Sequence, residues 1–180
     1  MTQAISSDFT GLLTRRFFRN FLPIPAQNRL NPGDRAPDLL LPDVNGQNQL
    51  QLSQCWGDRL VVLLFTRIFT EKQYCPLCFP HILAINGAYD QFCDRGVALL
   101  MITSTDAQQS QIVVRDLGLK MPLLSDPTCI SFRQYGTGQA LGAPLPAQFV
   151  IDPGGVIRDR HLFSFLHPNA SPEQLLQQIP

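Results

Sequence analysis

Two continuous apolar runs, at residues 60–66 and 97–103, restrict the possible folds of this chain more than any other feature. Both are rich in branched aliphatic residues and lack the polar–apolar alternation of a strand that faces water on one side. Such runs are typical of strands that are buried on both faces of a sheet. Segments of helical length follow each run, so the sequence predicts an α/β protein whose central sheet is covered on both faces.

Turn and capping residues divide the rest of the chain into short elements. Asp106 and Gly118 are placed to begin and end one helix, and Ser171 is placed to begin another. An Asn-Gly turn at 45–46 predicts an early β-hairpin, and the tight turn at 152–155 must join antiparallel strands, so the sheet is mixed. The other predicted segments are strands at 38–41, 49–52, 123–126, 148–151 and 156–161 and helices at 75–92 and 128–135.

The chain has 180 residues, which suits one domain preceded by an extension. Residues 12–22 contain three arginines and three phenylalanines before two prolines, which predicts a short amphipathic helix. A turn-rich cluster follows, so we expect an N-terminal extension at 1–30 and the main domain at 31–180. Residues 12–22 either dock on a membrane surface or a protein partner, or pack back on their own domain.

Charge and cysteine content exclude several classes of protein. Lys plus Arg equals Asp plus Glu, at 14 each, so the chain has no bulk attraction to nucleic acid. Five cysteines cannot all pair within one chain, and a domain of this size does not need disulfides, which favours a reducing, cytoplasmic location. The start lacks a basic region followed by an apolar run, and no apolar stretch is long enough to span a bilayer.

The segment Cys75–Cys78, with the sequence CPLC, is the candidate redox centre. It follows the first buried run and opens the predicted helix, with its proline at the first helical position. A helix N-terminus stabilises a thiolate, and the two-residue spacing lets the second sulfur attack a mixed disulfide on the first. We therefore predict Cys75 as an exposed nucleophile and Cys78 as the resolving residue. Tyr74 would shield one side of the site.

Zinc binding and simple burial in the core are the alternatives for this pair. A structural zinc site uses a second ligand pair at similar spacing, and the chain has no second Cys-x-x-Cys and no His-x-x-x-His. Cys55, Cys93 and Cys129 stand apart and are expected to be core residues, with a distant resolving cysteine as the alternative for Cys129. His81 is expected to be a surface or packing residue, with tuning of the thiols as its alternative. We therefore predict neither a metal site nor a cofactor.

Six motifs occur in a characteristic order along the chain. They are GDRAPD at 33–38, LQLS at 50–53, the strand at 61–66, CPLC at 75–78, PLLSD at 122–126 and FVIDPGG at 149–155. This order resembles the alkyl hydroperoxide reductase/thiol-specific antioxidant family, the redoxins of the thioredoxin fold. The resemblance implies a thioredoxin-like three-layer α/β/α sandwich with a mixed central sheet and an N-terminal β-hairpin. It also implies a thiol or disulfide protein partner or a small thiol reductant, with peroxide as a further substrate.

The chain departs from that family at the positions that assist peroxide chemistry. Typical peroxiredoxins carry a Pro-x-x-x-Thr-x-x-Cys pattern and a distant arginine. When Cys78 takes the last place of the pattern, Cys75, Glu71 and Pro146 occupy the threonine, proline and arginine positions. Alignment on Cys75 also leaves the threonine and proline unmatched. Without these helpers the developing charge is less stabilised, so peroxidase activity is expected to be weak.

The same departures resemble thioredoxin, in which a cis-proline faces the dithiol. Pro146 stands at that position, so its peptide bond is predicted to be cis. Together with Leu145 and Tyr74 it would bind the substrate. The sequence therefore favours a thiol–disulfide oxidoreductase. A thiol-dependent peroxidase and a non-enzymatic docking subunit are the alternatives.

Overall fold

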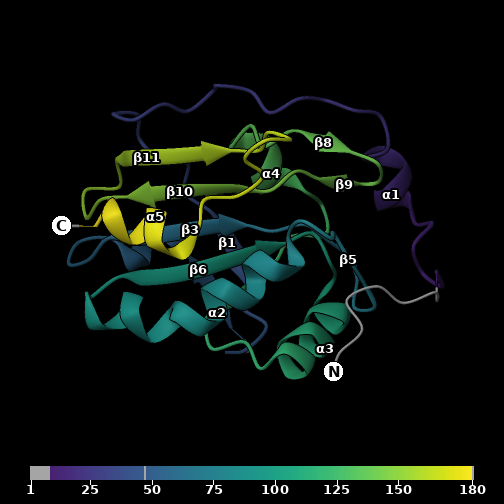
Figure 1. The fold of residues 1–180 in the computed structure, drawn as a ribbon, viewed down its shortest axis with the longest axis horizontal. Helices are drawn as coiled ribbons and strands as arrows, with labels where there is room; N and C mark the ends of the chain where they lie inside the picture. The colour runs from purple at the N-terminus through teal and green to yellow at the C-terminus, as the bar shows by residue number, and fades with distance from the viewer. Residues whose placement is uncertain (1–8, 47, 180) are drawn as a thin grey trace.

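The computed structural model describes residues 9–46 and 48–179, which are centred on one mixed β-sheet (Figure 1). The sheet has five strands in the order β11-β10-β3-β6-β7. These are β3 (Val61–Phe65), β6 (Ala98–Thr103), β7 (Leu123–Ser125), β10 (Ala147–Ile151) and β11 (Ile157–Leu162). Strands β3, β6 and β7 are parallel, whereas β10 is antiparallel to both of its neighbours. The predicted mixed sheet is confirmed.

Helices and a hairpin cover the two faces of this sheet and make the three predicted layers. The helices are α1 (Arg15–Arg19), η1 (Leu52–Cys55), α2 (Phe79–Asp94), α3 (Ala107–Leu117), α4 (Ile130–Gln134) and α5 (Pro172–Gln177). Successive residues of β3 point to opposite faces. Val62 and Leu64 pack with α2, α3 and α5, whereas Leu63 and Phe65 pack with α4 and the residues around the hairpin of β1 (Leu40–Pro42) and β2 (Gln49–Gln51).

The caps that the sequence predicts are in place. The Asp106 side chain accepts a hydrogen bond from Gln109 N at the start of α3, and Gly118 ends that helix in the left-handed region with φ 57°. Ser171 and Gln174 form a capping box at the start of α5. These local signals position the helices that cover the sheet. None of the helices in the described part of the chain is long and apolar enough to cross a membrane.

The N-terminal extension lies along the domain rather than apart from it (Figure 1). Ile24 and Gln139 exchange backbone hydrogen bonds of 2.8 Å, and Gln27 N donates to Gly136 O at 2.8 Å. Gln139 belongs to a small hairpin of β8 (Gln139–Ala140) and β9 (Ala143–Pro144). The structure therefore favours packing on the domain. Docking of residues 12–22 on a membrane or a partner stays a prediction.

Three glycines of the domain closely approach the N-terminal extension, and we call them the glycine track. Gly136, Gly138 and Gly142 all have positive φ, and a Cβ atom on any of them would meet the extension at under 3 Å. The atoms met are backbone atoms near Ile24 and Gln27 and the ring of Phe17. Only glycine combines this backbone conformation with so close an approach. Glycine at these three positions of the domain therefore leaves room for the extension to pack against it.

Candidate active site

Cys75 and Cys78 lie beyond the carboxyl end of β3, the edge at which α/β sheets carry their ligand sites. Between β3 and Cys75 the chain forms a short hairpin of β4 (Ile68–Thr70) and β5 (Gln73–Tyr74), which the sequence did not predict. The hairpin returns the chain to the end of β3, where Cys75 N donates to Arg67 O at 3.4 Å. The segment before the dithiol is thus an ordered part of the site.

The helix that carries the dithiol begins one turn later than predicted. Helix α2 starts at Phe79 with Cys78 as its N-cap, and Pro80, rather than Pro76, occupies one of its first positions. Before it, Cys75 O accepts hydrogen bonds of 2.9 Å from the N–H groups of Cys78 and Phe79. Proline is tolerated there because the first N–H groups of a helix have no partner within it. The prediction that Cys75 opens the helix is therefore wrong.

The two thiols form a hydrogen-bonded pair whose members differ in acidity. The Cys78 thiol donates to the Cys75 sulfur, and N–H groups of Leu77 and Cys78 with the charge of Arg67 add to this. Together they lower the pKa of Cys75 to about 6 against the opposing effect of burial. The same bond, with burial, raises the pKa of Cys78 above its ordinary value. These opposite shifts make Cys75 the more acidic of the two thiols.

The site is less open than predicted. Cys75 is 4% exposed and Cys78 is fully buried, so the prediction of an exposed first cysteine is wrong. The two residues between them are exposed, and Leu77 keeps 48% of its surface. The turn that brings the thiols together directs its intervening side chains outward and its sulfurs inward. Pro76 and Leu77 are therefore the exposed residues of the turn, and the sulfurs lie beneath it.

Arg67 lies beside the dithiol and was not among the site residues that the sequence predicts. It is 8% exposed, its guanidinium lies 4.7 Å from the ring of Phe69, and it donates to Ala140 O. Burial lowers its pKa, and the neighbouring Cys75 and Cys78 sulfurs oppose that effect. Arginine keeps its charge even when buried, so this is a fixed positive charge beside the dithiol. An arginine directly after a fully buried strand was the available signal.

The predicted substrate-binding residues are buried. Tyr74 is 4% exposed and its ring packs edge-on against Phe79 at 5.0 Å; burial raises its pKa to about 12. Leu145 and Pro146 are buried before β10, whose first residue Ala147 pairs with the last residue of β3. They therefore lie at the same edge of the sheet as the dithiol. Their contact with a substrate stays a prediction.

The prediction of a cis-proline is wrong. The structure has no cis peptide bond among its described residues, so the bond between Leu145 and Pro146 is trans. The trans form is the default for a bond to proline, by about 0.5–1 kcal/mol. The Gly- and Pro-rich sequence around Pro146 resembles the thioredoxin pattern without imposing the cis conformation.

An apolar groove of about 240 Å³ lies beside the dithiol. Its walls come from the N-terminal extension, the β4–β5 hairpin and the turn between the two cysteines. The lining residues are Phe9, Leu12, Phe17, Phe69, Gln73, Tyr74, Pro76 and Leu141. The groove gives the site an apolar approach, to which the extension contributes one wall.

The remaining cysteines and His81 separate into different environments. Cys129 is buried as predicted, Cys55 is half-buried, and Cys93 is exposed, so the core prediction for Cys93 is wrong. Cys93 follows the buried Phe92 on α2, and the next position on a helix turns away from the core. The ring of His81 is hydrogen-bonded to Ala170 O at 2.9 Å, which is a packing role. Within the described residues no group of three side chains could hold a metal ion.

The comparison with known protein families identifies the family of this chain. The AhpC/TSA family model matches residues 32–160. The chain belongs to the AhpC/TSA family. A candidate peroxiredoxin of Mycobacterium tuberculosis is 31% identical over 137 residues, which cover 72% of this chain and 83% of that protein. Peroxiredoxin tpx1 of Schizosaccharomyces pombe is 32% identical over 99 residues, covering 50% of this chain and 51% of the relative.

Solved structures agree on the fold of this AhpC/TSA protein. Reduced 2-Cys peroxiredoxin of Plasmodium vivax matches with a TM-score of 0.71 at 22% identity, covering 82% of this chain and 79% of the other. A candidate thiol:disulfide interchange protein DsbE of Chlorobium tepidum matches with a TM-score of 0.66 at 22% identity, covering 84% and 99%. The predicted family and thioredoxin-like fold are confirmed, and the chain is an oxidoreductase that acts on thiols or peroxides.

In this AhpC/TSA protein, the charge beside the reactive sulfur comes from an unexpected place in the sequence. The position at which the family pattern expects an arginine is Pro146. Arg67, at the end of β3, brings a guanidinium to Cys75 instead. The arginine near Cys75 therefore comes from the residues that follow β3, and the position before β10 holds a proline.

Proposed function

We propose that this protein is a thiol–disulfide oxidoreductase in which Cys75 is the nucleophile and Cys78 resolves the mixed disulfide. The observation that carries the proposal is the hydrogen bond between the two thiols, which lowers the pKa of Cys75 and raises that of Cys78. A thiolate is the form that attacks a disulfide, and the attacking thiol is most effective when its pKa lies near the ambient pH.

The exchange proceeds in two balanced steps. The Cys75 thiolate attacks one sulfur of the partner's disulfide; a mixed disulfide forms and the partner's other sulfur leaves as a thiolate. Cys78 then loses its proton and attacks the Cys75 sulfur, which releases the second partner thiolate and leaves a disulfide between Cys75 and Cys78. Two electrons have passed to the partner, and a dithiol protein or a small thiol reductant returns them. Arg67 stabilises the negative charge on sulfur in both steps.

Substitution of each cysteine tests this proposal. Cys75→Ser should abolish reduction of a protein disulfide such as that of insulin. Cys78→Ser should accumulate a mixed disulfide, which mass spectrometry detects as an adduct on Cys75. Cys93→Ser is the matched control, because it removes an exposed thiol far from the dithiol in sequence. Exchange that survives in Cys75→Ser would overturn the proposal.

A thiol-dependent peroxidase is the second candidate, and one observation favours it. Thr66 Oγ1 and Arg67 Nε are buried at the end of β3, and neither has a hydrogen-bond partner. Buried polar groups are normally paired, so two unpaired groups on consecutive residues, one of them the arginine beside Cys75, suit the oxygens of a small polar reactant. The chain therefore has groups that can replace part of the family's missing peroxide-binding pattern.

In that reaction, the Cys75 thiolate attacks a peroxide oxygen and the O–O bond breaks, giving Cys75 sulfenic acid and an alkoxide or hydroxide. This leaving group takes a proton from solvent and becomes an alcohol or water. The Cys78 thiol then condenses with the sulfenic acid, which forms the disulfide and releases water. Thr66→Val and Arg67→Lys should lower peroxide consumption by a larger factor than they lower disulfide exchange. A wild-type rate of peroxide consumption no faster than that of a small free thiol would exclude this second activity.

A further inference from the structure

We propose that Arg16, in the N-terminal extension, is a positioning residue of the redox site that holds the β4–β5 hairpin and, through it, the Arg67 guanidinium beside Cys75. The inference rests on the proposed function of the dithiol. It assigns the extension a part in the chemistry, although the extension lies outside the residues that match the family.

Arg16 is the arginine of α1 that turns into the protein. Arg15 and Arg19, on the same helix, are exposed, whereas Arg16 is half-buried. Its two terminal nitrogens donate to two backbone carbonyls, those of Ser104, which directly follows β6, and Phe69 in β4. The planar guanidinium thus joins the hairpin to the carboxyl edge of the central sheet.

Phe69 connects this contact to the dithiol. Its carbonyl is held by Arg16, and its ring lies 4.7 Å from the Arg67 guanidinium. Arg67 in turn faces Cys75 and Cys78, the two titratable groups at the centre of the site. A shift of Phe69 would therefore move the ring that contacts the Arg67 guanidinium. The guanidinium, whose charge stabilises the Cys75 thiolate, would then lose its fixed position.

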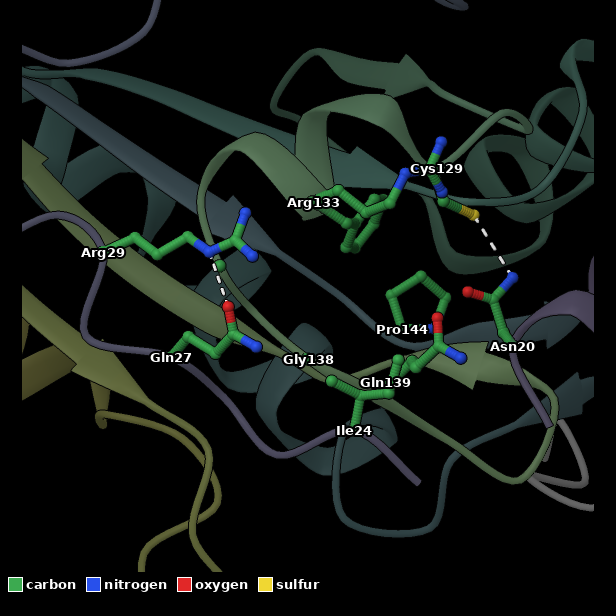
Figure 2. Close-up of a pocket in the computed structure, with 11 residues that line it drawn as sticks. Asn20, Ile24, Gln27, Arg29, Cys129, Arg133, Gly138, Gln139 and Pro144 are labelled. Atoms are coloured by element: carbon green, nitrogen blue, oxygen red, sulfur yellow. Dashed lines mark hydrogen bonds between the residues drawn. The ribbon is translucent and has the colours of Figure 1, made fainter. Parts of the chain in front are cut away.

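The extension itself is fixed, so Arg16 has a defined position. The Asn20 side chain donates to Arg16 O at 2.8 Å and to the buried Cys129 sulfur at 3.6 Å; Figure 2 shows the second of these bonds. Further along, Ile24 lies beside Gly138 and Gln139, on the glycine track (Figure 2). Residues that come after Arg16 in the sequence thus hold α1 against the domain.

The contacts of Arg16 differ from those of an arginine that is held by an ion pair. Burial lowers the pKa of Arg16, and Cys129 and Asp106 oppose that effect. Neither of these groups accepts a hydrogen bond from Arg16 among the contacts of the described residues, whereas two carbonyls do. The guanidinium is therefore placed by geometry toward backbone oxygens, which is the arrangement that fixes the position of a hairpin.

The test compares Arg16→Met with Arg19→Met, which removes the same charge from an exposed position on the same helix. The rate at which iodoacetamide alkylates Cys75 is followed against pH by peptide-resolved mass spectrometry. Arg16→Met should raise the midpoint of the alkylation rate against pH by about half a pH unit, which lowers alkylation at pH 6 about twofold. Arg19→Met should leave the midpoint unchanged.

Arg16→Lys separates position from charge, because lysine keeps the charge and loses the planar fork. The proposal expects Arg16→Lys to shift the midpoint as well. A midpoint equal to that of the wild type would show that Arg16 acts through its charge alone and would overturn the proposal. So would a variant Arg16→Met that melts at a lower temperature with an unmoved midpoint.

Phe69→Leu keeps the test decisive if Arg16→Met does not fold. It retains the backbone carbonyl and removes the ring beneath Arg67, so it should raise the Cys75 midpoint in the same direction; an unmoved midpoint would overturn the proposal. The alkylation assay does not depend on turnover. A wild-type protein that titrates as expected and yet exchanges no disulfide would therefore refute the proposed function and leave this inference standing.

Discussion

Cys75 and Cys129 are both buried and both lie near arginine side chains, yet their thiols are held in opposite states. The pKa of Cys75 is lowered to about 6, whereas the pKa of Cys129 is raised to about 11. At Cys129, burial and the charge of Asp126 outweigh the nearby guanidinium groups. At Cys75, the hydrogen bond from Cys78 comes first, and it outweighs burial.

The comparison shows that a neighbouring arginine does not by itself make a reactive thiolate. Cys129 has Arg16 and Arg133 within electrostatic reach and remains a thiol. Cys75 has one arginine and, in addition, a turn that aims a thiol and two backbone N–H groups at its sulfur. A thiol and two backbone N–H donors outweigh burial at Cys75, whereas the Asn20 side chain and two arginine charges do not outweigh it at Cys129.

The largest effect should come from removing each sulfur in turn. Cys75→Ser should lower the rate of disulfide exchange by more than about 100-fold, because the nucleophile is lost. Cys129→Ser should leave that rate within about twofold of the wild type, because a protonated buried thiol does not attack a disulfide. Steady-state reduction of insulin measures both. Comparable losses in the two variants would remove the distinction between the sites.

The second-largest effect should come from removing the Cys78 thiol, the hydrogen-bond donor that Cys75 has and Cys129 lacks. Cys78→Ala removes the hydrogen bond to the Cys75 sulfur and should raise the Cys75 pKa by about one unit or more. Cys78→Ser keeps a hydroxyl donor at the same place and should raise it less. Thiolate absorbance against pH measures both variants. An equal Cys75 pKa in the two variants would mean that the hydrogen bond from residue 78 does not lower it.

The lowered pKa of Cys75 should also make the stability of the reduced protein depend on pH. The folded protein loses this proton near pH 6, while the ordinary value of 9.0 applies to the unfolded chain. The unfolded state therefore binds more protons in this window, and stability rises from about pH 6 to about pH 9 and is lost as pH falls. The free energy of unfolding should rise by on the order of 1 kcal/mol or more, and Cys75→Ser should lack this rise.

The smallest effect should come from the acidic neighbour of Cys129. Asp126→Asn removes the charge that helps to raise the Cys129 pKa and should lower that pKa by less than about one unit. The Cys75 pKa should not change. The ¹³Cβ chemical shift of Cys129 against pH measures the first effect, and the shift of Cys75 provides the internal control. A fall that makes Cys129 a thiolate at neutral pH would contradict the part assigned to burial.

Much of the fold follows from local patterns in the sequence. The apolar runs became β3 and β6 because strands in the centre of a covered sheet need no polar face. Asp106, Gly118 and Ser171 marked helix ends because each satisfies backbone groups that the helix leaves unpaired. The dithiol was found for the same reason, since its spacing is a local property.

What the sequence did not give depends on contacts between distant segments. Arg67 reaches Cys75 because the unpredicted β4–β5 hairpin turns the chain back, and no local pattern reports that turn. The exposure of Cys75 depends on how the turn packs against its surroundings. The bond before Pro146 is settled by the trans preference of the chain and its packing, which a family motif does not determine.

The central claim is that Cys75 is the acidic member of the pair and that Cys78 is its hydrogen-bond donor. Titration of the ¹³Cβ chemical shifts of both cysteines in the reduced wild-type protein tests this directly. The account predicts a Cys75 transition near pH 6 and no Cys78 transition up to about pH 9. A Cys75 that stays protonated through neutral pH, or a Cys78 that titrates first, would contradict it.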